Sequence, residues 1–282
     1  MNILSIQSHV AFGHVGNSAA VFALQRLGVE VWPVHTVQFS NHTGYGSWRG
    51  RAFDADLIRE LVQGIDERGV LGACAGVLSG YAGTAEIGAA VLDAVARVKR
   101  ANPRARYCCD PVIGDADRGM YVRPAVADFL RARALPAADV ATPNHFELDH
   151  LVGRTTRTLA AVLDAVEALR AQGPRTVLVT SVAGADTPSD AIDLVACGGE
   201  GRFRVRTPRL PMAANGAGDT MAALFFAHLL RTGSTAQALS RAASAVFGVL
   251  QRTAAAGSGE MLLIAAQDEL VHPSRLFPVE SL

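Results

Sequence analysis

The residues with the clearest potential for chemistry are Asn215-Gly216-Ala217-Gly218-Asp219-Thr220, which directly precede an apolar run, MAALFFAHLL, at positions 221–230. The apolar run predicts a buried helix, so the backbone N–H groups of Gly216, Ala217 and Gly218 belong to its unsatisfied first turn or lie just before it. Such N–H groups can hold a phosphate, and the two glycines let a phosphate approach the backbone closely. The sequence therefore predicts an anion site at this helix start.

Asp219 places a carboxylate beside this anion site. A carboxylate next to a bound phosphate is repelled by it, so its presence there suggests that it has a chemical role. It could take the proton from a hydroxyl that attacks a γ-phosphorus, while the N–H groups stabilise the charge that develops on the transferred group. The alternative is that Asp219 only caps a helix after a glycine turn, and these six residues alone favour that alternative.

A second group with chemical potential is acidic and consists of Asp110, Asp115 and Glu147. Carboxylates projected from neighbouring strand ends can hold hydrated Mg²⁺ against nucleotide phosphates, and Mg²⁺ keeps several of its waters when it does so. Alone, Asp110-Pro111 is also typical of a simple turn. Together with a phosphate-holding helix start, the acidic group favours a site for metal and nucleotide.

Alternating strands and helices are predicted to position these residues. Short apolar runs predict strands at 2–7, 30–37, 75–79, 105–109, 140–142 and 177–179, followed by a hairpin at 191–196 and 201–207. Helical patterns occupy 16–27, 55–68, 84–100 and much of 234–270, and Thr84 is placed to cap its helix. This alternation predicts an α/β protein with a mostly parallel, doubly wound sheet and helices on both faces, in one domain over 1–282.

In such a sheet, ligands bind beyond the carboxyl ends of the strands. Many polar residues are predicted to lie at those ends, which indicates one shared cleft. They are Ser8, Tyr81, Asp110, Asp115, Thr142, Asn144, Glu147, Thr180 and Ser181. The polar, glycine-containing segment 38–46 interrupts the pattern after the second strand and is interpreted as a functional loop or flap.

Composition narrows the class of partner to small molecules. Lys plus Arg and Asp plus Glu are balanced at 26 each, and half of the residues are hydrophobic. This balance predicts neither a nucleic acid nor an anionic membrane as partner. The four cysteines include no CxxC pair, and no stretch resembles a secretory leader or a membrane span. We therefore expect a cytoplasmic protein.

Several spaced motifs together resemble the pyridoxal kinases, a ribokinase-like family. They are Ser5-Ile6-Gln7-Ser8-His9-Val10, Val37-Gln38-Phe39-Ser40-Asn41-His42-Thr43-Gly44-Tyr45, Ser79-Gly80-Tyr81, Asp110-Pro111-Val112-Ile113-Gly114-Asp115, Thr142-Pro143-Asn144, Val179-Thr180-Ser181 and Gly216-Ala217-Gly218-Asp219. The likeness extends from about residue 2 to beyond 251. It implies a three-layer αβα fold and transfer of phosphate from ATP to the 5′-hydroxymethyl group of pyridoxal, in vitamin B6 salvage.

The resemblance also implies individual roles. Asp219 resembles the general base, with Gly216, Ala217 and Gly218 as the anion hole. Ser8 and Thr43 correspond to residues that hydrogen-bond the pyridine nitrogen and the 3′-oxygen, while Val15, His42 and Tyr81 would surround the ring. Asp110, Asp115 and Glu147 would surround Mg²⁺, largely through water, and Thr142 and Thr180 would lie near a monovalent cation, expected to be K⁺. The residues implied to contact ATP are Asp110, Asp115, Tyr121, Thr142, Asn144, Glu147, Thr180, Ser181, Gly216 and Gly218. A homodimer is implied as well.

Two departures from the family pattern concern particular contacts. Met120 stands where some bacterial relatives carry a cysteine, so a covalent thiol contact to the pyridoxal aldehyde is in doubt. The segment 211–214 is smaller than expected beside an adenine ring. Two alternatives stay open: another ribokinase-like kinase, such as a hydroxymethylpyrimidine or nucleoside kinase, and a pyridoxal phosphate carrier or sensor without turnover. The preference among pyridoxal, pyridoxine and pyridoxamine is also open.

Overall fold

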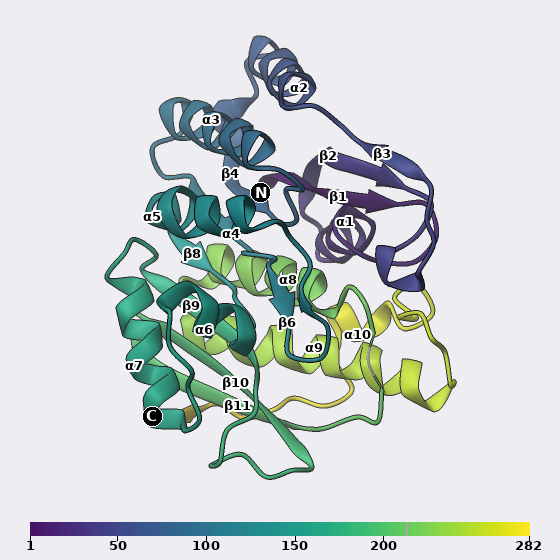
Figure 1. Ribbon diagram of the computed structural model, residues 1–282, viewed down its shortest axis with the longest axis vertical. Helices are drawn as coiled ribbons and strands as arrows, with labels where there is room; N and C mark the ends of the chain where they lie inside the picture. The colour runs from purple at the N-terminus through teal and green to yellow at the C-terminus, as the bar shows by residue number, and fades with distance from the viewer. Residues whose placement is uncertain (213) are drawn as a thin grey trace.

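The central sheet runs through the middle of the molecule, and the first strand of the chain lies inside it (Figure 1). The computed structural model describes residues 1–212 and 214–282, so Ala213 of the 211–214 segment lies outside the described residues. Within these residues, ten strands form the main sheet. Their spatial order is β12 (Glu280–Ser281), β11 (Gly201–Pro208), β10 (Ala191–Gly198), β9 (Thr176–Val182), β8 (Val140–Ala141), β5 (Arg106–Cys109), β4 (Cys74–Ser79), β1 (Asn2–Val10), β2 (Glu30–Phe39) and β3 (Gly50–Ala52).

The middle of this sheet is parallel and its two edges are antiparallel. The neighbours from β9 through β8, β5, β4 and β1 to β2 pair in parallel, whereas β3 and the β10–β11–β12 end pair antiparallel. A separate small ribbon is formed by β6 (Gly114–Asp115) and β7 (Gly119–Met120). The predicted mostly parallel sheet is confirmed.

Helices cover both faces of the sheet, which gives three layers (Figure 1). One face packs against α2 (Ala55–Glu67), α3 (Ala85–Ala101), α4 (Pro124–Phe129), the π-helical turn η3 (Leu130–Ala134), α5 (Leu135–Ala137), α6 (His145–Val152) and α7 (Leu159–Arg170). The other packs against α1 (Asn17–Arg26), α8 (Ala217–Thr232), α9 (Thr235–Ala255) and α10 (Asp268–Val271). Two 3₁₀ turns, η1 (Thr43–Tyr45) and η2 (Leu71–Ala73), complete the elements.

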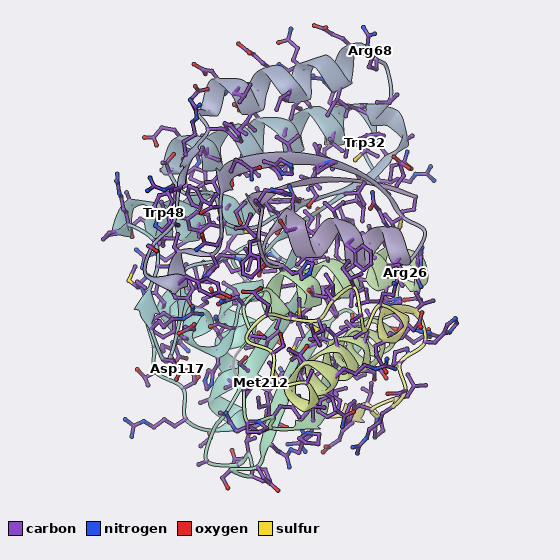
Figure 2. All side chains as sticks on the ribbon, turned by 90° about the vertical axis from the view of Figure 1, so that its right-hand side faces the viewer. Arg26, Trp32, Trp48, Arg68, Asp117 and Met212 are labelled. Carbon is purple, nitrogen blue, oxygen red and sulfur yellow. The ribbon has the colours of Figure 1, made fainter. Side chains whose placement is uncertain are left out.

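Successive side chains of a strand point to opposite faces, so each buried strand feeds two hydrophobic cores. Ile3 lies in the core beneath α1, α8 and α9, while Leu4 lies in the core on the other face. Cys108 and Cys109 divide in the same way and are both fully buried, as expected for small core residues. Side chains fill the space between the layers, whereas Arg68 projects from the outer end of α2 (Figure 2).

Hydrogen bonds at helix starts explain where several helices begin. The side chain of Thr84 accepts the N–H of Ile87 at the start of α3, as predicted, and Asn144 accepts the N–H of Glu147 at the start of α6. Such caps satisfy N–H groups that have no partner inside the helix. None of the helices in the described residues combines the length and the apolar character that a membrane crossing requires.

Several strands continue past the residues at which the sequence predicts their ends, β2 for example as far as Phe39 in the predicted flap, and two of the extended strands, β1 and β9, carry site residues. β1 extends through Val10, but its register with β2 shifts between Gln7 and His9, so Ser8 lies at a bulge. β9 extends to Val182, and its register with β10 shifts where Thr180 and Ser181 lie. Ser181 has a φ of 55°, in the left-handed region. Bulges interrupt a ladder and redirect side chains, so these residues still face the site.

Candidate active site

One cavity of about 590 Å³ lies at the carboxyl ends of the parallel strands. Every residue for which the sequence predicts a role at the site contributes to its lining. They are Ser8, Val15, His42, Thr43, Tyr81, Asp110, Asp115, Tyr121, Thr142, Asn144, Glu147, Thr180, Ser181, Gly216, Ala217, Gly218 and Asp219. The structure therefore brings the predicted residues together, while their individual roles stay predictions.

The glycine segment starts α8 as expected, and its geometry requires glycine at Gly216. Gly216 is the N-cap residue with a φ of 85°, and a Cβ on it would lie 1.7 Å from the carbonyl oxygen of His14. The start of α8 is thus pressed against the loop that precedes α1. Gly216, Ala217 and Gly218 line the cavity, and the first N–H groups of a helix have no partner within it, so an anion in the cavity could accept them.

Asp219 is the third residue of α8, and the helix has no side-chain cap. Burial raises the pKa of the Asp219 carboxyl, while the backbone N–H groups of Gly16 and of Asp219 itself act in the opposite direction. Gly16 is the N-cap of α1, so the carboxylate lies between two helix starts. A partly buried carboxylate with a raised pKa is a suitable acceptor for a proton at neutral pH.

Asp110 is almost completely buried and accepts a hydrogen bond of 2.8 Å from the Thr142 hydroxyl. Burial raises its pKa well above the usual range, and the nearby carboxylates Glu147 and Asp219 raise it further. The Thr142 hydrogen bond opposes this shift only in part. Negative charge at this end of the cavity is therefore incompletely balanced by the protein.

Glu147 holds the surrounding backbone in place. Its Oε1 accepts the N–H of Ile113 at 2.9 Å and of Gly114 at 3.3 Å, and its Oε2 accepts the N–H of Asn144 at 2.8 Å. Burial still raises the pKa of Glu147 to about 7, against the effect of these hydrogen bonds. With both oxygens already accepting backbone donors, Glu147 is suited to contact a metal ion through water.

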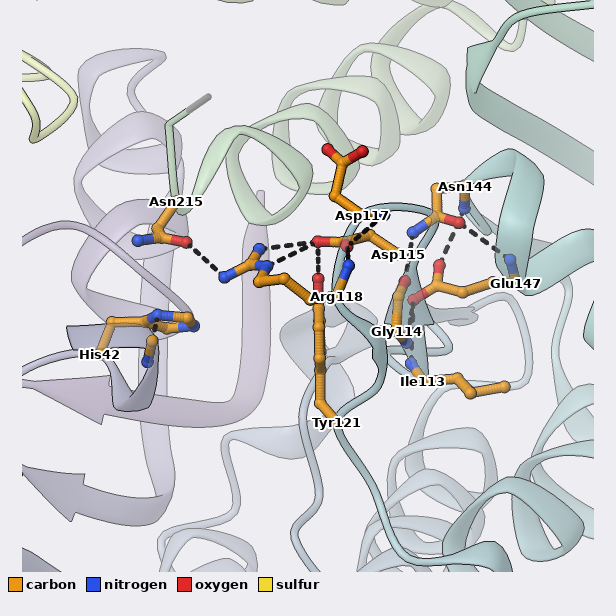
Figure 3. Close-up of polar contacts among 11 residues, drawn as sticks. His42, Ile113, Gly114, Asp115, Asp117, Arg118, Tyr121, Asn144, Glu147 and Asn215 are labelled. Carbon is orange, nitrogen blue, oxygen red and sulfur yellow. Dashed lines mark hydrogen bonds and ion pairs between the residues drawn. The ribbon is translucent and has the colours of Figure 1, made fainter. Parts of the chain in front are cut away.

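Asp115 is paired with a residue that the sequence analysis missed, Arg118. The Nε and Nη2 atoms of Arg118 donate to Asp115 Oδ2 at 3.0 and 2.7 Å, and its Nη1 donates to Asn215 Oδ1 at 3.2 Å (Figure 3). The Tyr121 hydroxyl also donates to Asp115. Although burial acts to raise it, the bonds from Arg118 lower the pKa of Asp115. An arginine three residues after an aspartate in a turn was the signal available in the sequence.

The three carboxylates suit a hydrated cation better than a directly bound one. No group of three or more His, Cys, Asp or Glu side chains within residues 1–212 and 214–282 is arranged as a direct metal site. Burial, with smaller contributions from neighbouring carboxylates, raises the pKa values of Asp110 and Glu147, and a nearby cation would favour their charged forms. Mg²⁺ retains waters in such sites, so this donor set is compatible with it.

The flap contributes another wall of the cavity, through His42, Thr43 and Gly44. It connects β2 to β3, and η1 within it is capped by His42, whose Nδ1 accepts the Gly44 N–H at 3.1 Å. Burial lowers the pKa of His42, and the charge of Arg118 lowers it further, which favours a neutral ring. The Tyr45 hydroxyl donates to Glu260, which ties the flap to the segment between α9 and α10.

An apolar wall completes the cavity on the side of Thr180 and Ser181, and the sequence analysis did not identify it. It combines the β10–β11 hairpin and its following segment with the inner face of α9, namely Ile192, Leu194, Leu210, Val246, Phe247 and Leu250. These residues come from segments more than 30 positions apart. Met120, by contrast, is not among the described residues that line the cavity.

The fold and a family match together define the class of this protein. The family model for phosphomethylpyrimidine kinase matches residues 74–263, about two thirds of the chain, which makes the protein a ribokinase-like small-molecule kinase. A pyridoxal kinase PdxY of Granulibacter bethesdensis is 56% identical over 98% of this chain and 98% of that protein. Another PdxY, from Rubrobacter xylanophilus, is 55% identical over 99% and 97%.

A solved structure agrees with these relatives. The pyridoxal kinase of Leishmania donovani in complex with ADP and pyridoxamine is 32% identical, with a TM-score of 0.92 over 100% of this chain and 99% of that one. The chain belongs to the pyridoxal kinase family.

Proposed function

We propose that this protein transfers the γ-phosphoryl group of ATP to the 5′-hydroxymethyl group of pyridoxal, giving pyridoxal 5′-phosphate and ADP. The observation that carries the proposal is the position of Asp219 between the starts of α1 and α8, beside the anion site. The names of the two PdxY relatives and the ADP and pyridoxamine bound to the Leishmania enzyme support the choice of substrates.

In the proposed reaction, the 5′-hydroxyl oxygen forms a bond to the γ-phosphorus as the bond from that phosphorus to the β,γ-bridging oxygen breaks. The hydroxyl proton goes to Asp219, and ADP leaves with the electron pair of the broken bond. The N–H groups of Gly216, Ala217 and Gly218 stabilise, by hydrogen bonds, the negative charge that develops on the transferred group. Burial of Asp219 favours this step, because it raises the pKa of the accepting carboxyl.

The other predicted residues hold the two substrates. Ser8 and Thr43 would hydrogen-bond the polar atoms of the pyridine ring, and Val15, His42 and Tyr81 would enclose it. Asn144, Thr180, Ser181 and Tyr121 would contact the ATP phosphates. The apolar wall defined above is suited to the adenine ring, since all six of its side chains are aliphatic or aromatic.

Mg²⁺ and a monovalent cation belong to the proposal as well. Asp110, Asp115 and Glu147 would hold Mg²⁺ largely through water, and Thr142 and Thr180 would lie near K⁺. Mg²⁺ would offset the charge of the triphosphate. The support is the excess negative charge around Asp110, whose pKa burial and the neighbouring carboxylates raise.

We also propose that the protein acts as a single-domain kinase in the cytoplasm and forms a homodimer. A cytoplasmic location is supported by the cysteines Cys74, Cys108, Cys109 and Cys197, which are free and buried among the described residues. The homodimer is supported by the resemblance to the pyridoxal kinases.

A coupled assay of ADP release tests the proposed function. Purified protein is given ATP, Mg²⁺, K⁺ and either pyridoxal, pyridoxine, pyridoxamine or hydroxymethylpyrimidine. We expect turnover with pyridoxal that exceeds turnover with hydroxymethylpyrimidine. A preference for hydroxymethylpyrimidine would instead support the alternative kinase, and pyridoxal phosphate binding without ADP release would support a carrier or sensor.

A further inference from the structure

Arg118 reaches across the cavity from the turn between β6 and β7. Its guanidinium joins Asp115 Oδ2, at 2.7 and 3.0 Å, to Asn215 Oδ1, at 3.2 Å (Figure 3). Asn215 directly precedes Gly216, the N-cap residue of α8. The Arg118 side chain therefore links Asp115, which we propose to lie near ATP, with Asn215, which directly precedes the anion site.

The flap meets the same guanidinium. A Cβ placed on Gly44 would lie 3.1 Å from Arg118 Nη1, so glycine at this position leaves room for the arginine. Gly44 follows Thr43, which we assign to the pyridoxal ring. Arg118 is thus close to residues from three separate segments: the flap, the β6–β7 turn and the start of α8.

Among the residues that the structure describes, Arg118 brings a positive charge to a cavity whose other charged side chains are carboxylates. Four carboxylates line the cavity, those of Asp110, Asp115, Glu147 and Asp219, and Arg118 is the one arginine or lysine among the described lining residues. A phosphoryl group in transfer spreads negative charge over three oxygens. The planar guanidinium presents paired N–H donors whose geometry matches such oxygens, and its charge persists at any physiological pH.

The present partner of Arg118 can be exchanged. The side chains of Arg118 and Asp115 are 47% and 29% exposed, and an ion pair this accessible to water contributes little to stability. Asp115 retains the Tyr121 hydroxyl and the backbone N–H groups of Asp117 and Arg118 as donors when the guanidinium turns away. Movement of Arg118 toward a phosphate therefore leaves Asp115 with hydrogen-bond partners.

We propose that Arg118 is a catalytic residue whose guanidinium contacts the phosphoryl group during its transfer from ATP to the substrate hydroxyl. This inference rests on the kinase function proposed above. Arg118 forms and breaks no covalent bond in this role. It supplies positive charge opposite the N–H groups of α8, and its return to Asp115 and Asn215 follows release of the product.

The test compares Arg118→Met with a matched control, Arg131→Met. Arg131 forms the same kind of exposed (i, i+3) pair with Asp128, at 3.0 Å, outside the cavity lining. For each protein we would measure kcat with pyridoxal and the melting temperature. We would also measure by calorimetry the Kd of ADP, first for ADP alone and then for ADP in the presence of aluminium fluoride and pyridoxal. ADP with aluminium fluoride imitates the phosphoryl group in transfer, so its affinity reports contacts made in the transition state.

For Arg118→Met we expect kcat to fall about 10²- to 10³-fold, as when one donor to a developing charge is removed. The affinity for the aluminium fluoride complex should weaken in parallel, while the Kd of ADP alone changes by less than about threefold. Arg118→Lys keeps the charge without the paired donors and should lose roughly 10-fold in kcat. The control should match wild type in both kcat and Kd.

Four results would overturn the assignment. A kcat within about threefold of wild type for Arg118→Met would remove the catalytic role. A parallel loss of ADP affinity would show that Arg118 only holds Asp115 in place. If Arg118→Met fails to fold, Arg118→Lys decides, and an unchanged kcat in that variant counts against the proposal. Absence of wild-type turnover with pyridoxal would refute the proposed function and the role of Arg118 with it.

Discussion

Asp219→Asn separates the general-base assignment from a purely structural one, because only a general base predicts a large loss of kcat without a loss of stability. The asparagine oxygen can still accept the N–H of Gly16, but it cannot take the substrate proton. General-base catalysis contributes about 10²- to 10⁴-fold, or roughly 3–5 kcal/mol of barrier at 1.36 kcal/mol per decade. We expect kcat to fall by this factor, with the KM for ATP unchanged or lower.

The stability of the variant follows from the sign of the pKa shift. Burial raises the pKa of Asp219 in the folded protein above its unfolded value. Ionised Asp219 therefore destabilises the fold at neutral pH, and this cost is lost as the pH falls through the folded pKa. Asparagine carries no charge, so the melting temperature of Asp219→Asn at pH 7 should equal or exceed that of wild type.

Asp139→Asn is a suitable control for these measurements. Asp139 lies before β8, at the end of the strand away from the cavity, where it accepts the Tyr107 N–H at 2.7 Å and pairs with Lys99 at 2.8 Å. Its loss should lower the melting temperature and leave kcat unchanged. If Asp219→Asn retains more than about a tenth of kcat with pyridoxal, the base assignment is wrong.

Further predictions concern binding, metal, backbone and pH. Thr43→Ala should raise the KM for pyridoxal about 2- to 13-fold, for a hydrogen bond worth 0.5–1.5 kcal/mol, and an equal change for ATP would contradict its placement. EDTA should abolish turnover and K⁺ should raise it, in the ADP-release assay. Gly216→Ala should lower the melting temperature, since its Cβ would lie 1.7 Å from the His14 carbonyl oxygen, whereas Gly218→Ala, with nothing within 4 Å, should not. Burial, with a contribution from the neighbouring His9, lowers the pKa of His35 from 6.5 to about 4. The unfolded chain therefore binds more protons than the folded one between these pH values, so the free energy of unfolding in urea should fall as the pH decreases from 6.5 toward 4. His35→Gln should make this pH dependence weaker.

The order of strands and helices could be predicted from the sequence because each element carries its own periodicity. Thr84 shows the same for helix starts, since its cap forms within four residues. The ends of β1 and β9 could not be predicted, because they depend on pairing with distant strands. Ser8 and Thr180 face the cavity from bulges rather than from strand ends, and a bulge is defined only by the register with its partner strand.

Residues that line the cavity could be predicted where one short motif contains both the glycines that start a helix and a reactive side chain, as at Gly216 and Asp219. Parts of the site were missed where they come from separate segments. The pair of Arg118 with Asp115 had a local signal in the sequence, but the contact of Arg118 with Asn215, 97 positions away, had none. The apolar wall is hidden for the same reason: its leucines and valines read as ordinary core residues until the hairpin and α9 are brought together.

The packing of α1 against α8 has a consequence for the newly made chain. The core beneath these helices contains Ile3, Ala19 and Leu24 from the beginning of the chain together with Leu224 and Phe225. A ribosome adds about 5–20 residues per second, so the roughly 200 residues between the two helices take about 10–40 s to appear. During that time α1 can pack against β1 and β2, but the apolar surface that α8 covers in the folded protein has no partner. Until α8 has been synthesised, this uncovered surface is therefore expected to make the nascent chain prone to aggregation.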